Sequence, residues 1–344
     1  MKALTLTAYH QFQFGDAPDP APEAGDLLVR IAACGICGSD VHGMDGSSGR
    51  RIPPLIMGHE AAGTVEAAGP EAAAQGWKPG DRVTFDSTVY CGECDFCKAG
   101  RVNLCTSRNV LGVSCGDYRR HGAMAELLAL PARIAHRLPD GMSFEEAAFA
   151  EPVSVALHAV SRIPVQKGDV AVVFGTGIIG LLVLQALKRA GAETVYAVDL
   201  DEGRLRLAEQ LGAAAGIVST PDAAAQIRER TGGRGADIAM EVVGISPTLK
   251  LAVESVRVGG SVGLVGNIHA EATLPLQAAV TRELTLYGSC AVCGEYPEAI
   301  AAIADGTIQV KPLISAVAPL AEGSDWFGRL YAGKEDLIKV ILQP

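Results

Sequence analysis

Apolar residues recur with two different spacings along this chain. Up to about residue 150, short apolar segments alternate with turns rich in Gly and Pro, as at 27–31, 62–66 and 81–85. Short, evenly bounded segments of this kind are typical of β-strands. The first region is therefore expected to form a compact β-rich domain with long loops.

The second region repeats a longer unit. A wholly apolar segment at 170–174 is followed by a Gly-rich turn, a helical pattern at 178–190 and a second strand at 194–199. An uninterrupted apolar strand is typical of a parallel sheet that is covered on both faces. Further elements are expected as a helix at 204–212, which ends at a glycine, and as strands at 238–243, 261–265 and 284–287. This alternation predicts a doubly wound α/β domain.

These patterns divide the chain into three segments. Residues 1–150 form the expected β-rich domain, and residues 151–289 form the doubly wound domain. From residue 290 the spacing of apolar residues changes again, which predicts that the segment 290–344 folds back onto the first domain.

The net charge of the chain indicates which classes of binding partner to expect. The 344 residues carry 39 acidic and 29 basic side chains, a formal net charge of −10, without a run of Lys or Arg. Nucleic acids and anionic membranes are therefore not expected as partners, because binding to them depends on neutralising their negative charge. No apolar run reaches the length of a membrane span and the amino terminus lacks a signal-peptide pattern, so a cytoplasmic location is expected.

A glycine motif follows the apolar strand at 170–174. Its residues are Gly175, Thr176, Gly177, Ile178, Ile179 and Gly180. A G-x-G-x-x-G string between a strand and a helix predicts a dinucleotide site, with the pyrophosphate at the helix amino terminus.

The next strand ends in Asp199, whose carboxylate can bind the adenosine ribose and would repel a 2′-phosphate. NAD is therefore favoured as the cofactor. Arg204 is close by and keeps NADP open as an alternative, because an arginine can accommodate that phosphate.

Four of the nine cysteines form a tight group. Cys91, Cys94, Cys97 and Cys105 follow the pattern C-x₂-C-x₂-C-x₇-C. In a chain without a secretion signal, clustered cysteines are more typical of a metal site than of disulfides. Four thiolates can close a tetrahedron around Zn²⁺, which predicts a structural zinc site. An iron–sulfur cluster is the alternative.

A second set of possible metal ligands is scattered through the first region. It comprises Cys37, His59, Glu60 and Glu151. Sulfur, imidazole and carboxylate together suit zinc, and three protein ligands would leave one position open for a substrate oxygen. Taken singly, each of these residues could also belong to an ordinary turn or helix start. Cys34 is interpreted as a packing residue, although Cys34 and Cys37 also have the spacing of a redox pair.

The motifs together resemble the zinc-dependent branch of the medium-chain dehydrogenase/reductase superfamily, and most of all sorbitol, threonine and galactitol-1-phosphate dehydrogenases. The resemblance rests on residues 34–42, 58–60, 151–158 and 175–180 and on the four-cysteine group. It implies a GroES-like catalytic domain and a Rossmann NAD-binding domain. It also implies that Cys37 and His59 bind a catalytic zinc, with Glu60 and Glu151 supplying the carboxylate contacts. Asp40 would then hydrogen-bond His59.

The same resemblance implies a reaction. A secondary hydroxyl of a polyol-like small molecule would be oxidised to a ketone, with hydride transferred to NAD. The hydroxyl proton would leave through Ser39 and then His42, and Glu60 and Glu151 complete the expected catalytic residues. A homo-oligomer, dimer or tetramer, is expected from the same relatives.

The resemblance is incomplete in two places. Sorbitol dehydrogenases have a tyrosine directly after the relay histidine, where this chain has Gly43, and an arginine in the segment that corresponds to 288–293, where this chain has none. Sorbitol itself is therefore in doubt as the substrate. A threonine- or phosphopolyol-type dehydrogenase and a non-catalytic zinc- and NAD-binding protein stay open as alternatives.

Overall fold

The computed structural model describes all 344 residues, and they divide into two compact units. Unit 1 comprises Met1–Glu151, Val292–Gly306 and Val310–Pro344, and unit 2 comprises Pro152–Ala291 and Thr307–Gln309. Helix α5 (Ala150–Ser161) begins in unit 1 and continues into unit 2. The predicted α/β fold class is confirmed.

Unit 1 is built on a seven-stranded sheet in the order β12-β6-β5-β3-β20-β19, with β11 also paired to β3. Its strands are β3 (Asp26–Gly35), β5 (Glu60–Ala68), β6 (Arg82–Phe85), β11 (Leu127–Pro131), β12 (Ala135–Arg137), β19 (Ile314–Pro319) and β20 (Lys339–Gln343). The strands predicted at 27–31, 62–66 and 81–85 are therefore present as β3, β5 and β6. The last strand, β20, runs antiparallel to β3, with Ile341 opposite Gly35.

The remaining strands of unit 1 form three small sheets, β2-β1-β4, β10-β9 and β7-β8. Their bounds are β1 (Lys2–Ala8), β2 (Gln11–Asp16), β4 (Leu55–Ile56), β7 (Thr88–Val89), β8 (Asn109–Val110), β9 (Val113–Ser114) and β10 (Arg119–Arg120). The helical elements are α1 (Gly38–Gly43), α2 (Pro70–Ala74), α3 (Asp95–Lys98), α4 (Phe144–Ala147), α11 (Tyr296–Ala304), α12 (Gly323–Ala332), η1 (Val102–Leu104), η2 (Ala132–Ile134), η3 (Lys311–Leu313) and η4 (Leu320–Glu322).

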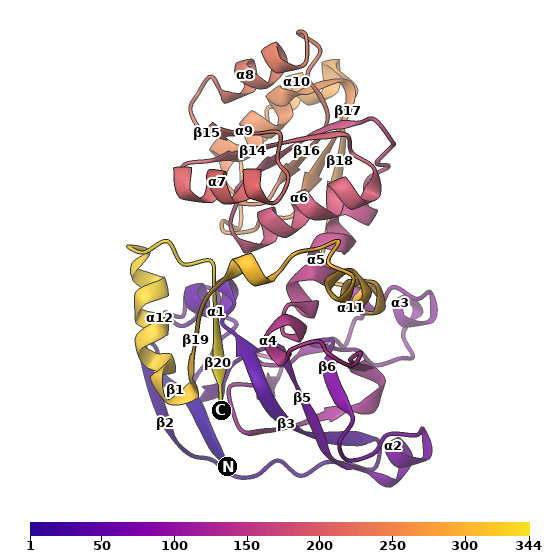
Figure 1. Cartoon of the computed structure of the whole chain (residues 1–344), viewed down its shortest axis with the longest axis vertical. Coiled ribbons are helices and arrows are strands. Elements are labelled where there is room, and N and C mark those ends of the chain that lie inside the picture. The colour runs from indigo at the N-terminus through magenta and orange to yellow at the C-terminus, as the bar shows by residue number, and fades with distance from the viewer. The chain divides into compact units, whose positions relative to one another are not determined.

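A single apolar core joins distant parts of the sequence in unit 1. Leu4, Leu27 and Phe85 are fully buried in it together with Phe327 of α12. Phe327 stacks on Phe12 of β2 with ring centroids 4.5 Å apart, and Figure 1 shows α12 running along β1 and β2. The C-terminal residues therefore contribute to the same core as the first strands.

Unit 2 contains one parallel sheet of six strands in the order β15-β14-β13-β16-β17-β18. Numbered from its first strand, this is the 3-2-1-4-5-6 order of dinucleotide-binding folds. Its strands are β13 (Val170–Phe174), β14 (Thr194–Asp199), β15 (Ala215–Val218), β16 (Ala236–Glu241), β17 (Val256–Leu264) and β18 (Thr285–Gly288).

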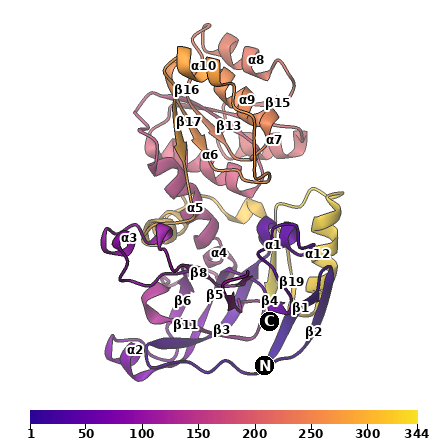
Figure 2. The ribbon, with the colours of Figure 1, turned by 180° about the vertical axis from the view of Figure 1, so that it is seen from behind.

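Helices cover both faces of this sheet. They are α6 (Ile178–Ala190), α7 (Glu202–Gln210), α8 (Ala223–Arg230), α9 (Ser246–Ser255) and α10 (Leu276–Thr281). Figures 1 and 2 show α6 on one face and α8 and α9 on the other. The strands at 170–174 and 194–199 and the helix at 178–190 begin and end as predicted. Helix α7 begins two residues before the predicted start because Asp201 caps it, accepting a hydrogen bond from the Arg204 N–H (3.0 Å).

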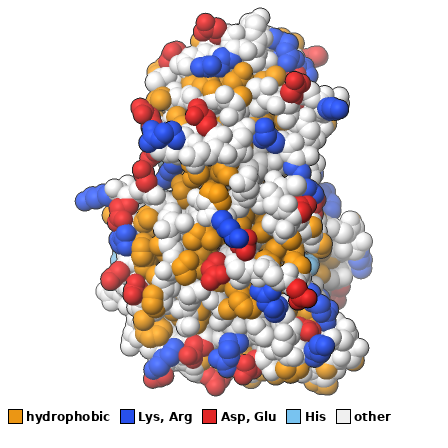
Figure 3. Space-filling view, in the orientation of Figure 1, with side chains coloured by type: hydrophobic (Ala, Val, Ile, Leu, Met, Phe, Trp, Pro, Cys, Tyr) orange, Lys and Arg blue, Asp and Glu red, His pale blue; other side chains and the backbone are white.

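None of the helices combines the length and the apolar composition that a membrane crossing requires. On the face of the molecule seen in Figure 3, acidic and basic side chains are interspersed rather than gathered by sign.

Candidate active site

Three of the four scattered ligand candidates meet at one end of the β3–β5 pair. Cys37 lies directly before α1, Glu60 is the first residue of β5, and His59 precedes it. The pairing of β3 with β5 places Gly35 opposite Glu60, and this brings the two distant segments together. One ligand atom each of Cys37, His59 and Glu60 lies within 4.8 Å of the others.

The chemistry of this group fits a zinc ion. The Glu60 and His59 side chains are buried, and Cys37 is half-buried. Burial, with the negative charge of Glu60 next, raises the pKa of the Cys37 thiol to about 12, so the group is short of positive charge. Sulfur, nitrogen and oxygen donors at this spacing are the set that zinc accepts.

Glu151, the fourth candidate, is not part of this ligand group. It is half-buried at the start of α5. Burial raises its pKa to about 8, with Glu60 and Cys37 acting in the same direction and His59 opposing them. The group whose ligand atoms lie within 4.8 Å of one another therefore contains Glu60 and not Glu151, although Glu151 is close enough to interact electrostatically with all three members.

The expected partner of His59 is present, but the expected hydrogen bond is not formed. Asp40 is fully buried in α1, and its Oδ2 lies 3.5 Å from His59 Nδ1. Neither of these two atoms has a hydrogen-bond partner. Ligand histidines commonly turn their second ring nitrogen toward a carboxylate, so the juxtaposition is the one a metal-bound His59 needs.

The two relay candidates both lie on α1. Ser39 is exposed and its hydroxyl donates a hydrogen bond to Cys37 Sγ (3.2 Å). His42 follows one turn later and is exposed, so its imidazole can exchange a proton with water. Helical spacing of three residues places both on neighbouring parts of the helix surface.

Cys34, in contrast to Cys37, is a fully buried core residue with a free thiol, in agreement with the packing interpretation.

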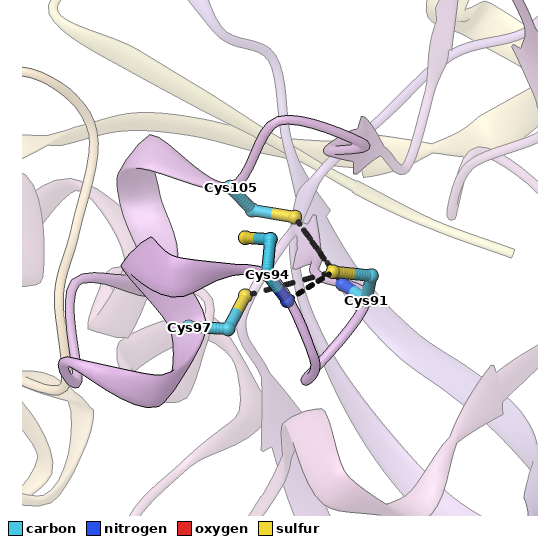
Figure 4. A group of neighbouring side chains, drawn as sticks. All are labelled: Cys91, Cys94, Cys97 and Cys105. Carbon is cyan, nitrogen blue, oxygen red and sulfur yellow. Dashed lines mark hydrogen bonds between the residues drawn. The ribbon is translucent and has the colours of Figure 1, made fainter.

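The four remaining cysteines of interest form their own centre in the loop around α3. Figure 4 shows the side chains of Cys91, Cys94, Cys97 and Cys105 converging on one point. Their sulfur atoms all lie within 4.8 Å of one another, with Cys91 Sγ 3.5 Å from Cys105 Sγ and 3.9 Å from Cys97 Sγ.

Backbone N–H groups favour the thiolate form in this lobe. The amide of Cys91 donates to Cys105 Sγ (3.3 Å), and that of Cys94 donates to Cys91 Sγ (3.4 Å). Hydrogen bonds from the Cys97 and Thr106 amides lower the pKa of Cys94 to about 6. A closed set of four sulfur ligands suits a structural zinc, because no position is left for a substrate.

In unit 2 the glycine motif forms the turn between β13 and α6. Gly175 has φ +92°, a conformation that side-chain-bearing residues rarely adopt. A Cβ on Gly180 would lie 1.8 Å from the Gly175 carbonyl oxygen, whereas a Cβ on Gly177 would meet nothing within 4 Å. The turn is therefore tight on its protein side and open at Gly177, where Ile178 and Ile179 begin the helix.

Asp199 at the end of β14 closes the same turn. Its Oδ2 accepts hydrogen bonds from the Thr176 amide (2.6 Å) and hydroxyl (2.9 Å), and its Oδ1 accepts one from the Asp201 amide (3.0 Å). The Nε of Arg204 is buried and has no hydrogen-bond partner. The structure thus places the carboxylate predicted for cofactor choice at the glycine turn, and the predicted arginine lies in the first turn of α7, after β14.

Comparison with protein families decides the assignment. Residues 23–140 match the model of the alcohol dehydrogenase GroES-like domain, and residues 179–305 match that of the zinc-binding dehydrogenases. This chain belongs to the zinc-dependent medium-chain alcohol dehydrogenase family. The predicted pairing of a GroES-like domain with a Rossmann domain is thereby confirmed, as is the predicted family.

Individual relatives agree with the family. The dehydrogenase is 33% identical to sorbitol dehydrogenase of Bacillus subtilis, over 100% of this chain and 97% of the relative. It is 34% identical to probable D-xylulose reductase A of Neosartorya fischeri, over 96% and 94% of the two chains. The solved structure of alcohol dehydrogenase TADH from Thermus sp. ATN1 superposes with a TM-score of 0.92 at 31% identity, covering 100% of this chain and 99% of the other.

Two residues of the dehydrogenase's candidate site were missed by sequence reasoning. Lys339 is 1% exposed, and its ammonium donates to Glu60 Oε2 (2.5 Å) and to the Ile36 carbonyl (2.9 Å). The sequence signal was a lysine at the head of an apolar strand. Arg51 is 5% exposed and donates from Nε to Asp40 Oδ1 (2.7 Å). No local pattern distinguishes Arg51 from its neighbour Arg50.

Proposed function

We propose that this dehydrogenase oxidises a secondary hydroxyl of a polyol-like molecule to a ketone, reversibly, with NAD as the hydride acceptor. The observation that carries the proposal is the mixed group of Cys37, His59 and Glu60, whose ligand atoms lie within 4.8 Å of one another. Two relatives that align over nearly the whole chain are named for polyol chemistry, as sorbitol dehydrogenase and D-xylulose reductase.

Cys37, His59 and Glu60 would hold the catalytic zinc, with Glu151 as a further carboxylate beside them. When bound, the ion supplies Lewis-acid polarisation of the substrate hydroxyl. Asp40 Oδ2, which lies 3.5 Å from His59 Nδ1, would orient the imidazole once the ring binds the metal through its other nitrogen. Lys339 holds Glu60 in place and offsets the negative charge of the group.

The chain's own proton pathway would run along α1. Ser39 Oγ takes the proton of the substrate hydroxyl while passing its own proton toward His42, and the exposed imidazole of His42 releases it to water. A histidine suits this step because its ordinary pKa lies near neutrality. The Ser39 hydroxyl donates to Cys37 Sγ in this structure, so it must rotate to take part.

Unit 2 would bind the dinucleotide. The open backbone at Gly177 and the amino terminus of α6 would hold the pyrophosphate, and Asp199 would accept hydrogen bonds from the adenosine ribose. NAD, when bound, accepts the hydride. A carboxylate at this place disfavours the extra phosphate of NADP, while the unpaired Nε of Arg204 is the feature that would tolerate it.

Several finer assignments follow from the same proposal. Residues 1–150 would act as the catalytic domain, 151–289 as the NAD-binding domain and 290–344 as the segment that completes the first. The four-cysteine lobe would hold a structural zinc. A dimer or tetramer and a cytoplasmic location stay predictions, and light scattering coupled to gel filtration would measure the first of these.

A substrate panel tests the proposal. Nicotinamide absorbance is followed with NAD and, separately, with NADP, against acyclic polyols, cyclitols, threonine and galactitol 1-phosphate, with a chelator-treated control. Turnover of a polyol with NAD that is lost on chelation and restored by zinc supports the proposal. Turnover of threonine or the phosphopolyol alone would overturn the substrate class, and no turnover by protein that binds zinc and NAD would favour the non-catalytic alternative.

A further inference from the structure

The Arg51 side chain hydrogen-bonds two residues of the proposed site at the same time. Its buried guanidinium donates from Nε to Asp40 Oδ1 (2.7 Å) and from Nη2 to Ser39 Oγ (3.2 Å). Its third group, Nη1, donates to the carbonyl of Arg50 (3.0 Å). One arginine thus contacts both the residue that faces His59 and the residue expected to accept the substrate proton.

The backbone of Arg51 is anchored outside α1. The Ser114 amide donates to the Arg50 carbonyl (3.2 Å), and the Ile52 amide donates to the Ser114 carbonyl (3.1 Å), so both neighbours of Arg51 are tied to β9. The guanidinium therefore reaches α1 from a fixed support, which is what a positioning residue requires.

The space for Arg51 depends on Gly43. A Cβ on Gly43 would lie 2.5 Å from Arg51 Cγ and 3.1 Å from Ser48 Oγ. Cγ belongs to the stem of the side chain, so the arginine cannot avoid the clash by moving its tip alone. Gly43 does not have a positive φ, so its backbone conformation would accept alanine. Glycine is unfavourable within a helix, and the room needed by Arg51 is the reason that the structure offers for it here.

We propose that Arg51 is a positioning residue for the reaction, and that Gly43 is present because a side chain there would displace it. The proposal rests on the function proposed above. A guanidinium only donates hydrogen bonds, so Ser39 Oγ accepts from it. Arg51 thus holds the Ser39 oxygen in place, while the single hydroxyl proton, which now points to Cys37 Sγ, can still rotate toward the relay. Arg51 also occupies Asp40 Oδ1 and leaves Oδ2 for His59.

A double-mutant cycle tests the proposal through two separate readouts. The variants are Arg51→Ala, Gly43→Ala, the double variant and Arg51→Lys, with Arg50→Ala as the matched control because its side chain is exposed. The first readout is kcat and KM on whichever alcohol the wild type oxidises. The second is zinc retention at the Cys37–His59–Glu60 group against a chelator, which needs no substrate.

Residues that support metal ligands typically change activity or metal affinity by about 10- to 100-fold when removed. We expect Arg51→Ala and Gly43→Ala each to lower kcat and zinc retention by about 10-fold or more, with KM changed less. Gly43→Ala should have no further effect in the Arg51→Ala background. Arg51→Lys should recover only part of the loss, because an ammonium lacks the branched, planar set of N–H donors with which the guanidinium reaches Asp40 and Ser39 together.

The outcomes separate this proposal from the proposed function. Additive effects of Gly43→Ala and Arg51→Ala, or a loss of thermal stability with kcat and zinc retention unchanged, would overturn the positioning role. If the wild type oxidises no alcohol, the proposed function fails, and coupling in the zinc-retention cycle still decides whether Arg51 positions the ligand group. Arg51→Lys keeps a cation beside Asp40, and Gly43→Ala leaves the arginine itself unchanged, so these two variants test the proposal even if Arg51→Ala does not fold.

Discussion

The ammonium of Lys339 lies 2.5 Å from Glu60 Oε2, across a glycine. Lys339 begins β20 and Glu60 begins β5, with β3 between them in the sheet. At Gly35 of β3 a Cβ would lie 2.5 Å from Glu60 Oε2 and 3.4 Å from Lys339 Cδ. The absence of a side chain at Gly35 therefore allows the two buried charges to meet beside the ligand group.

Removing the lysine should destabilise the protein. Burial is the largest single influence on the pKa of Lys339 and would lower it. The charges of Glu60 and Cys37 and the hydrogen bond to Glu60 together outweigh burial and raise the pKa, so the ammonium stays charged. Loss of one partner from a buried pair costs about 3–5 kcal/mol, whereas an exposed pair contributes about 0–1 kcal/mol. Lys339→Met should therefore lower the free energy of unfolding by about 3 kcal/mol or more in urea titrations.

Lys311→Met is the matched control, because Lys311 pairs with Glu146 at 3.3 Å while 75% exposed. Equal losses in the two variants would contradict the importance of the buried pair.

A buried aspartate should make stability depend on pH. Burial raises the pKa of Asp86 to about 6, against an ordinary value of 3.8. A carboxyl group whose pKa is raised by folding stabilises the protein fully below its unfolded pKa, and this contribution is lost as the pH rises through the folded pKa. Two pKa units correspond to about 3 kcal/mol. The wild type should therefore lose about 2–3 kcal/mol relative to Asp86→Asn between pH 4 and pH 7.

Urea titrations of both proteins at fixed zinc measure this difference. A constant difference between them across that range would show that Asp86 ionises normally in the folded protein.

The four-cysteine lobe should hold one of two zinc ions per chain. Cys94→Ser removes one ligand of the closed set, so we expect metal analysis to fall from two zinc ions to one and the melting temperature to drop. Cys115→Ser is the control, because Cys115 lies outside both ligand groups. Iron in the purified protein, with visible absorbance lost in Cys94→Ser, would instead establish an iron–sulfur cluster.

Cofactor choice should depend on the charge of Asp199. Asp199→Asn keeps an oxygen acceptor for Thr176 but removes the negative charge that would repel a 2′-phosphate. A charged hydrogen bond contributes about 1.5–3 kcal/mol, so the ratio of kcat/KM for NADP to that for NAD should rise roughly 10-fold or more. The exposed Asp222→Asn in the same unit should leave the ratio unchanged. An unchanged ratio in Asp199→Asn would remove this residue from cofactor selection.

Local patterns were enough to predict the centre of unit 2. The strand at 170–174, the helix at 178–190 and the strand at 194–199 depend on neighbouring residues alone, and their bounds were predicted correctly. The strand predicted at 238–243 instead ends at Glu241. There the carboxylate of Glu241 accepts hydrogen bonds from the amides of Val243 (3.0 Å) and Gly244 (2.9 Å), which turns two apolar-looking positions into a loop.

The candidate site was predictable only in part. Residue types and order suggested Cys37, His59 and the two glutamates as ligand candidates, but it is the pairing of β3 with β5 that brings Glu60 to Cys37 and His59. Lys339 reaches Glu60 over 279 positions of sequence, and Arg51 reaches Asp40 from a loop tied to β9. Contacts of this kind are set by tertiary pairing and leave no periodic trace in the sequence.

The most direct test of the account compares His59→Ala with the wild type for zinc content and for NAD-dependent oxidation of a polyol, under identical conditions. We expect His59→Ala to keep the zinc of the four-cysteine lobe, lose the second ion and lose turnover, while still binding NAD. Wild-type turnover by His59→Ala that holds a single zinc would contradict the claim that the Cys37–His59–Glu60 group carries the reaction.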